Sequence, residues 1–309
     1  MLRDIGRAFA GEGVLTERQG AMLVAGAGVA FSVTAIAYEG VESATDFQFL
    51  TYRGLSTAVA MLLLVLARRR GRPVSFAGVT RMTWAAGSVL AATSMLYILA
   101  LARTTAATTL FLLAASPIVA AALGWLILRE PVARSTFTAI GITAVGVAIT
   151  VGAGLTVGST FGLVFAATIP VSIGCYSVLM RSMPEVDPVV PTLIAGVILA
   201  MAAASAAVAT EGSLAIPGRD VLMASISGGL ALGVGLPMFN LGHRSVAAAR
   251  VPLLLMTEVV LAPLWVWIWP GQTPGIATLV GGAVILGAVV WLVSRTERAD
   301  ADLVVSPVG

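Results

Sequence analysis

Two ionisable residues fall inside long apolar stretches of this sequence, and they are the side chains best placed to do chemistry. Glu258 lies about eight residues into the stretch Val251–Trp269, roughly 12 Å from its start at 1.5 Å per residue. In a bilayer such a group is costly unless it is neutral, paired or hydrated. We interpret Glu258 as a cavity carboxylate that binds a substrate amine or carries a coupling proton. The alternative is a protonated glutamate that hydrogen-bonds to a neighbouring helix.

Arg53 is the second ionisable residue at depth, about 9 Å from the nearer end of the stretch Phe47–Leu66. One role for Arg53 is an ion pair with a substrate carboxylate. The other role is structural, because a long arginine side chain can extend outward to the polar membrane surface. The sequence leaves both roles open.

Motifs for hydrolysis or nucleotide binding are absent from the sequence. It contains no His-Glu-x-x-His zinc motif, no Gly-x-x-x-x-Gly-Lys phosphate loop and no Gly-x-Ser-x-Gly nucleophile elbow, and its only histidine is His243. An intramembrane enzyme needs acids, histidines or cysteines clustered at depth, and Cys175 is the only cysteine. We therefore expect no enzymatic activity, no metal site and no cofactor.

Composition places these residues in a membrane protein. Hydrophobic residues make up 58% of the chain and charged residues 11%, with a mean hydropathy of +0.99, whereas soluble domains carry about 25% charged residues. Ten apolar stretches approach the ~20 residues that cross a hydrocarbon core, and backbone groups in lipid require helices. These predicted spans are Gln19–Tyr38, Phe47–Leu66, Met82–Ala102, Thr105–Leu128, Phe137–Gly152, Phe161–Leu179, Val189–Val208, Val221–Leu241, Val251–Trp269 and Ile276–Val293.

The ten stretches form two sets of five at a constant offset of 141 residues, so that Asp46 recurs as Asp187 and Arg103 as Arg244. Matches between alanines or leucines can arise by chance, but charged pairs in one register favour duplication. Halves with an odd number of spans must lie in opposite orientations. The sequence therefore predicts an all-α membrane protein of ten transmembrane helices in two inverted five-helix repeats, residues 19–152 and 158–293, flanked by segments 1–18 and 294–309.

Arginine predicts the orientation, since the sequence has no lysine. With the N-terminus in the cytoplasm, fifteen arginines face inward, Arg103 and Arg219 face outward, and Arg53 lies in a span. This bias indicates that both termini are cytoplasmic. The net charge of +3 then reflects topology rather than nucleic-acid binding. The segment before Gln19 has no apolar core of the length that a secretory signal needs, so we expect it to remain as a cytoplasmic segment.

Two related sequence signatures carry a resemblance to a known family. Each runs from the end of one predicted span into the next, and the first includes the pair Ser116 and Pro117. The first signature is Leu99–Ala107 followed by Ala115–Pro131, and the second is Asn240–Ala248 followed by Thr257–Trp269. Together they resemble the third and fourth helices of the drug/metabolite transporter superfamily, EamA type. One departure is Gly271, which stands where the first copy has Glu130.

The resemblance implies an exporter of small metabolites in the bacterial inner membrane, similar to the amino-acid exporters of that superfamily. It also implies alternating access through a central cavity lined mainly by the first, third, fourth, sixth, eighth and ninth helices. Polar and aromatic side chains on those helices are the next candidates for substrate contact: Tyr97, Tyr176, Asn240, Ser32, Trp84, Ser116 and Ser177.

Each of these residues also has a structural alternative. Hydroxyl groups often bond to carbonyls of their own helix, and Trp84 lies where aromatic belts form at the membrane surface. Prolines on the same helices are candidates for gating bends, because proline removes an intrahelical hydrogen bond. These prolines are Pro117, Pro237, Pro252 and Pro263.

We expect a secondary transporter that exports amino acids, including aromatic or other apolar ones. The alternative is a multidrug or toxic-cation exporter, in which Glu258 binds quaternary amines beside aromatic rings. An alternative of another class is a non-transporting membrane enzyme or scaffold. The expected partners are a small-molecule substrate, the lipid bilayer and a proton as candidate coupling ion, without nucleic acid, and the expected assembly is a monomer or weak homodimer.

Overall fold

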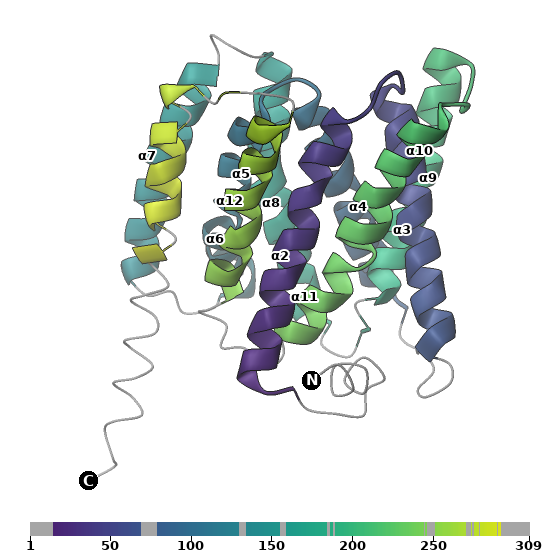
Figure 1. Cartoon of the computed structure of the whole chain (residues 1–309). Helices are drawn as coiled ribbons and strands as arrows, with labels where there is room; N and C mark the ends of the chain where they lie inside the picture. Colours follow the sequence, from purple (N-terminus) through teal and green to yellow (C-terminus); the bar gives the residue numbers. More distant parts are fainter. Residues whose placement is uncertain are drawn as a thin grey trace.

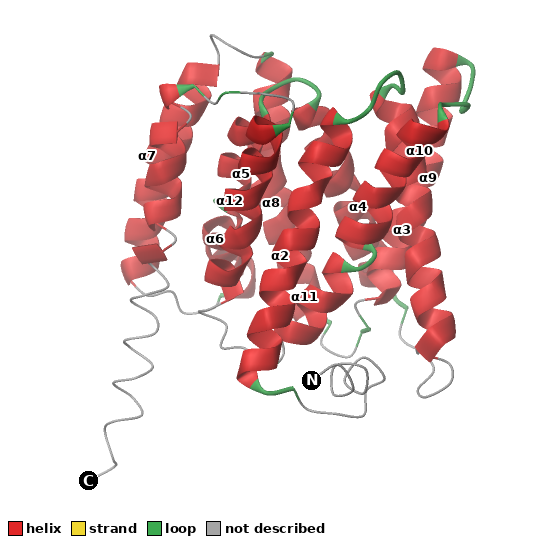
Figure 2. Ribbon diagram, viewed as in Figure 1, coloured by secondary structure: helices red, strands yellow, loops and turns green. Residues whose placement is uncertain are grey.

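The computed structural model describes residues 15–68, 79–129, 134–154, 159–183, 186–187, 189–243, 245, 251–269, 273, 275–277, 279–288 and 290–291. Every element in these ranges is a helix, which confirms the all-α expectation for this part of the chain (Figure 2). Seven helical segments in the described ranges are long and apolar enough to cross a membrane: Glu17–Glu39, Asp46–Ala67, Arg81–Leu101, Ala106–Ile127, Thr160–Met180, Val189–Glu211 and Gly218–Gly242. Two shorter apolar helical segments are Phe137–Gly146 and Leu279–Ala288.

The helices lie side by side as a bundle, and most run the full height of the molecule (Figure 1). We call the end that carries turns 40–45, 102–105 and 212–217 the upper end, as it is drawn in Figure 1. The helices are α2 (Glu17–Glu39), α3 (Asp46–Arg68), α4 (Arg81–Leu101), α5 (Ala106–Leu113), α6 (Ser116–Leu128), α7 (Arg134–Gly154), α8 (Thr160–Arg181), α9 (Val189–Glu211), α10 (Gly218–Ser225), the π-helix η1 (Ile226–Leu232), α11 (Gly235–His243) and α12 (Val251–Ile268).

The predicted fourth span, Thr105–Leu128, is interrupted and forms two helices, α5 and α6. The interruption follows from Pro117, which has no backbone N–H to donate and so leaves the Leu113 carbonyl without its helical donor. The Ser116 hydroxyl donates to that carbonyl instead. The segment Ala106–Ile127 is nevertheless long and apolar enough to cross a membrane, so the predicted span is found with a break in its middle.

The predicted eighth span, Val221–Leu241, is divided into α10, η1 and α11. Its middle part is a π-helix, a wider turn that is rare and often found at functional sites. Gly228 in this π-helix lies directly against the backbone carbonyl of Arg53 in α3, where a Cβ atom would collide with it. The widened turn and the missing side chain let the two backbones meet at mid-height.

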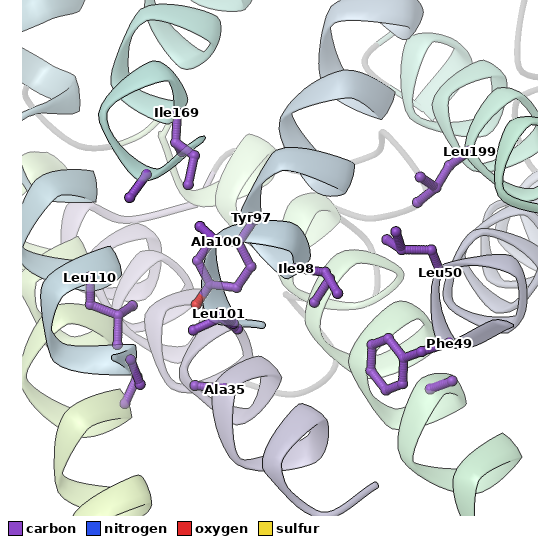
Figure 3. Close-up of a cluster of buried hydrophobic side chains, with 14 of the residues drawn as sticks. Ala35, Phe49, Leu50, Tyr97, Ile98, Ala100, Leu101, Leu110, Ile169 and Leu199 are labelled. Carbon is purple, nitrogen blue, oxygen red and sulfur yellow. The ribbon is translucent and has the colours of Figure 1, made fainter. Parts of the chain in front are cut away.

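A cluster of buried apolar side chains joins α2, α3, α4 and α8 (Figure 3). In this view Tyr97 points from α4 toward Ala35 of α2, while Leu50 of α3 lies near Leu199 of α9. The packing of α3 on α9 is the most extensive contact in the bundle. It depends on two glycines, because a Cβ atom at Gly54 would lie 2.5 Å from the Ala200 nitrogen and one at Gly196 would lie 2.7 Å from the Ala58 nitrogen.

Gly54→Leu is therefore expected to destabilise the protein. Overpacking a close contact typically costs about 1–3 kcal/mol, and here the nearest neighbours are backbone atoms that cannot rotate away. The melting temperature of the purified protein in detergent measures the effect. Gly218→Ala is the matched control, because no atom lies within 4 Å of its added Cβ. An equal melting temperature for the two variants would contradict this packing.

Candidate functional site

Arg53 is buried at mid-height between α3, α4 and η1, with 3% of its surface exposed. Its Nε donates to the Ser94 hydroxyl of α4 at 3.0 Å, and one terminal nitrogen donates to the hydroxyl and the carbonyl of Ser227 in η1. The side chain thus does not extend to the membrane surface, and its bonds join α3 to α4 and η1. The structural role and the role in binding a substrate carboxylate both stay predictions. In the described part of the chain no carboxylate lies within ion-pair distance of Arg53.

Neutral oxygens alone therefore hold this guanidinium. A guanidinium has five N–H donors, and the bonds to Ser94 and Ser227 use only part of that set. A buried cation without a carboxylate partner is costly to maintain in a membrane domain. The arrangement leaves positive charge at the centre of the bundle and donors to spare for an anion.

Tyr97 contributes a second polar group to the same region. Its side chain is buried in the apolar cluster, with 7% of its surface exposed, and its hydroxyl has no hydrogen-bond partner in the described structure. Tyr97 lies one turn after Ser94 on α4, and Ser94 accepts a hydrogen bond from Arg53. A buried polar group without a partner is uncommon and points to a functional explanation.

Glu258 lies in α12 and is partly buried. Its backbone packs against α2 at Gly28, where an added Cβ would lie 3.2 Å from the Glu258 nitrogen. The carboxylate interacts electrostatically with Arg53, but no described residue forms a hydrogen bond with it. We call Arg53, Tyr97 and Glu258 the polar centre.

The polar centre combines a fixed cation, a hydroxyl and a carboxylate on three different helices. None of these groups bonds to another within the described structure, so each keeps capacity for a ligand. A guanidinium fits a carboxylate with two parallel hydrogen bonds, and a glutamate attracts an ammonium group. The arrangement can therefore bind a molecule that carries both charges.

Ser32 and Ser116, both predicted contact residues, form hydrogen bonds within the protein. Ser32 in α2 is fully buried, donates to the Val29 carbonyl at 2.7 Å and accepts from the Trp265 indole nitrogen of α12 at 3.1 Å. Ser116 donates to the Leu113 carbonyl at the break between α5 and α6. These contacts favour the structural alternative for both serines.

Ser32→Ala is accordingly expected to lower stability rather than substrate affinity. The change leaves the Trp265 indole N–H without its acceptor, which costs about 1–3 kcal/mol for a buried group. Thermal unfolding of the purified variant measures the loss, and the apparent KM of the transported substrate should stay near the wild-type value. A large rise of KM at unchanged melting temperature would return Ser32 to the set of substrate contacts.

The remaining predicted contact residues are spread over three helices. The Tyr176 hydroxyl of α8 is buried near Thr192 of α9, and Ser177 and Asn240 are partly buried in α8 and α11. Trp84 of α4 is 54% exposed and is not brought to the polar centre. Their role in substrate binding stays a prediction, and the structure groups only Tyr97 with Glu258 and Arg53.

The four candidate prolines occupy different positions. Pro117 lies in the first turn of α6, directly after the interruption, and Pro237 lies in the first turn of α11, after η1. Pro252 is the second residue of α12, where proline fits a helix at little cost, and α12 continues through Pro263 without a break. Only Pro117 and Pro237 thus adjoin helix interruptions that can serve as hinges.

A cavity of about 10 Å³ lies between α3, α4, α9, η1 and α11, and none of the three residues of the polar centre lines it. Its lining includes Ser94, which accepts from Arg53, and Thr57, which donates to the carbonyls of Arg53 and Gly228. This volume corresponds to about one water molecule, whereas ligand pockets measure about 300 Å³ or more. A metabolite therefore needs the surrounding helices to move before it can reach Arg53 from this side.

Sequence reasoning missed Ser94, Ser227 and the π-helix that places Ser227 beside Arg53. Small polar residues in a helix give no distinct signal in a sequence, and no pattern here announces a π-helix. It also missed Asp220, a fully buried carboxylate that accepts three backbone N–H bonds from residues 42–44. Asp220 directly precedes the predicted span Val221–Leu241, and this position was the sequence signal that could have pointed to it. Glu130, Arg244 and Gly271, which the sequence singled out, lie outside the described residues.

Comparison with known proteins assigns part of this chain. A solved structure titled "Crystal structure of protein" aligns with 88% of this chain and 97% of its own, with a TM-score of 0.65 and 18% sequence identity. At that identity the likeness shows the fold alone. No curated protein matches the chain. The model of the EamA-like transporter family matches residues 18–152. The stretch from α2 into α7 is therefore an EamA-like transporter family domain, of the drug/metabolite transporter superfamily.

Proposed function

We propose that this protein is a secondary transporter that exports amino acids, including aromatic and other apolar ones, across the bacterial inner membrane by alternating access. The EamA-like domain supports membrane transport of small metabolites, and seven candidate spans support a multi-pass protein. The substrate class is inferred from the polar centre. There the buried cation Arg53 and the carboxylate of Glu258 lie apart, each without an ion-pair partner among the described residues.

Helix contacts support the proposed ten-helix inverted repeat. In the proposed order of spans, α2 is the first, α8 the sixth, and α3 and α9 are the second and seventh. The first span, α2, packs on the eighth span, which is η1 and α11, and on the ninth span, α12. The sixth span, α8, packs on the third span, α4, and on the fourth span, which is α5 and α6. If each span of one half is replaced by the equivalent span of the other half, the contacts of the first span become those of the sixth. An inverted repeat requires this relation. The upper end is then the outer face, with both termini in the cytoplasm.

An amino acid fits the polar centre in one orientation. Its carboxylate accepts from the Arg53 guanidinium and the Tyr97 hydroxyl, which have donors available. Its ammonium group lies toward Glu258, whose carboxylate has no other hydrogen-bond partner in the described ranges. The buried side chains around Tyr97, such as Leu101 and Ile98, provide apolar surroundings for an aromatic or aliphatic side chain (Figure 3).

The same geometry argues against the toxic-cation alternative. A permanently cationic drug would satisfy Glu258 but would lie near the positive charge of Arg53, which has no ion-pair partner in the described ranges. In a medium of low dielectric constant, repulsion between like charges is much stronger than in water. Glu258 also remains a candidate carrier of a coupling proton, because a glutamate that loses its ammonium partner at this depth is stabilised by protonation.

Counterflow in proteoliposomes tests this function. Liposomes preloaded with unlabelled phenylalanine should accumulate labelled phenylalanine from the outside, and a panel of other amino acids then defines the range. A parallel run with a pH gradient measures proton coupling. Flux of quaternary ammonium compounds alone would establish the cation exporter instead. No flux of any compound from protein that remains folded would contradict transport altogether.

A further inference from the structure

The turn between α2 and α3 is tied to the start of α10 at the upper end. Asp220 is fully buried and accepts hydrogen bonds from the backbone nitrogens of Glu42, Ser43 and Ala44 at 2.9, 3.0 and 2.8 Å. In addition, side chains of α3 donate to two carbonyls of the turn 212–217 at 3.0 Å each. The upper parts of α2, α3 and α10 therefore form one unit, which we call the first unit.

The turn between α4 and α5 is tied to the start of α8 in a similar way. The Arg103 carbonyl accepts from the Ser159 nitrogen at 3.3 Å, and a Cβ atom added at Gly162 would lie 2.7 Å from that same carbonyl group. The Arg103 guanidinium lies 5.8 Å from the centre of the Phe165 ring. The upper parts of α4, α5 and α8 form the second unit.

One ion pair joins the two units directly. Arg103 of the second unit donates to an Asp46 oxygen of the first at 3.0 Å, and the other Asp46 oxygen accepts from the Tyr38 hydroxyl at 2.5 Å. Tyr38 lies in the last turn of α2, one turn above Ala35, which lies in the apolar cluster with Tyr97. The ion pair therefore lies above the part of that cluster that contains Ala35 and Tyr97.

We propose that the Asp46–Arg103 pair is a lock that holds the upper end closed, and that transport requires its opening. The lock rests on the proposed function, because a gate has a purpose only if a substrate passes. Its exposure suits this role: the two side chains are 24% and 36% exposed, and ion pairs in such positions are weak enough to open and close readily. Both partners recur in the sequence at the 141-residue offset, although Arg244 lies outside the described residues, so only the upper pair is proposed as a lock.

Thiol labelling of whole cells tests the lock without a transport measurement. Cys175 is first replaced by serine, and Ala35→Cys then provides a buried reporter below the pair. A membrane-impermeant maleimide should label this reporter slowly while the pair is intact. Arg103→Gln and, separately, Asp46→Asn should each speed labelling about fivefold, the equilibrium shift that corresponds to one partly exposed ion pair. Arg103→Lys keeps the charge and should stay near the slow rate.

Arg219→Gln is the matched control. It also removes an ion pair at the upper end, but Arg219 pairs with Glu42, and Asp220 already ties those two elements together within the first unit. Its labelling rate should match the intact protein. A second reporter, Ala215→Cys in the exposed turn 212–217, should react at once and establishes that the upper end faces the medium.

Equal rates for Arg103→Gln, Asp46→Asn and Arg219→Gln would overturn the lock. If one of the two partner variants, Arg103→Gln or Asp46→Asn, misfolds, the other still tests the lock. Size-exclusion chromatography of the labelled proteins identifies a misfolded variant. Because labelling measures the access of a reagent and counterflow measures the flux of a substrate, a failure of the lock leaves the counterflow result untouched. A failure of counterflow with faster labelling in both variants would show a gate whose cargo is not an amino acid.

Discussion

Glu258→Gln is expected to slow phenylalanine counterflow about 100-fold and to remove its response to a pH gradient. A hydrogen bond to a charged group contributes about 1.5–3 kcal/mol, and the upper part of that range corresponds to about a hundredfold change. Glutamine keeps the size and the oxygen of glutamate but can neither attract an ammonium group through charge nor carry a proton. The two roles proposed for Glu258 therefore fail together in this variant.

Glu258→Asp is the matched control for this prediction. It keeps the charge but shortens the side chain, so transport should be weakened while its pH dependence is retained. The rates of both variants are measured in proteoliposomes at several pH values, with melting temperatures recorded in parallel. Unchanged rate and pH dependence in Glu258→Gln would exclude Glu258 from both substrate binding and coupling.

Arg53→Gln is expected to raise the apparent KM for phenylalanine about 100-fold, because the substrate carboxylate loses the charged donors that bind it. The variant should also lose its discrimination against phenethylamine, which resembles phenylalanine without the carboxylate. Competition by both compounds in the counterflow assay measures these effects. Arg53→Lys should recover only part of the affinity, since a lysine ammonium cannot form the two parallel bonds of a guanidinium.

The stability of Arg53→Gln has to be measured as well, because Arg53 is buried. The change removes donors from the Ser94 and Ser227 hydroxyls, so some loss of stability is expected as well. Ser94→Ala removes one of these bonds but keeps the charge, and serves as the control for stability alone. If Ser94→Ala and Arg53→Gln altered the KM equally, Arg53 would act through packing rather than as a ligand for the carboxylate.

Long-range regularities of the sequence predicted most of the helices. Apolar stretches such as Gln19–Tyr38 and Val189–Val208 fall within a few residues of α2 and α9, because hydrophobic length decides whether a segment can span a membrane. The depth of Glu258 and Arg53 followed from the same reasoning. The proposed two-fold relation of the halves rested on the 141-residue offset, and the exchange of helix contacts now supports it independently.

Local interruptions of the helices were harder to foresee. Pro117 adjoins the break between α5 and α6, whereas α12 continues through Pro263, although proline removes a hydrogen bond in both places. The Ser116 hydroxyl takes over the lost bond to the Leu113 carbonyl at the place where the helix breaks, so the lost hydrogen bond alone does not decide between a break and a continuous helix. Such contacts depend on the folded surroundings and are not written in the local sequence.

The partners of the buried charges were equally hidden. Arg53 bonds to Ser227, which lies 174 positions further along the chain, and Asp220 reaches back 178 positions to the Glu42 nitrogen. Pairs at such separation are fixed by the packing of α3 against η1 and of α10 beside the turn 40–45. Hydrophobic periodicity predicts which faces are buried but not which polar groups meet there.

The central claim is that the polar centre binds the two charges of an amino acid. The most direct test removes one charged group at a time from the substrate and one charged side chain at a time from the protein. Phenylalanine, phenethylamine and 3-phenylpropanoate are compared as competitors of labelled phenylalanine in wild type, Arg53→Gln and Glu258→Gln. Arg53→Gln should erase the preference over phenethylamine alone, and Glu258→Gln the preference over 3-phenylpropanoate alone, because each substitution removes the partner of one charge. If each variant instead weakened all three compounds by the same factor, the polar centre would hold the helices together and the substrate would bind elsewhere.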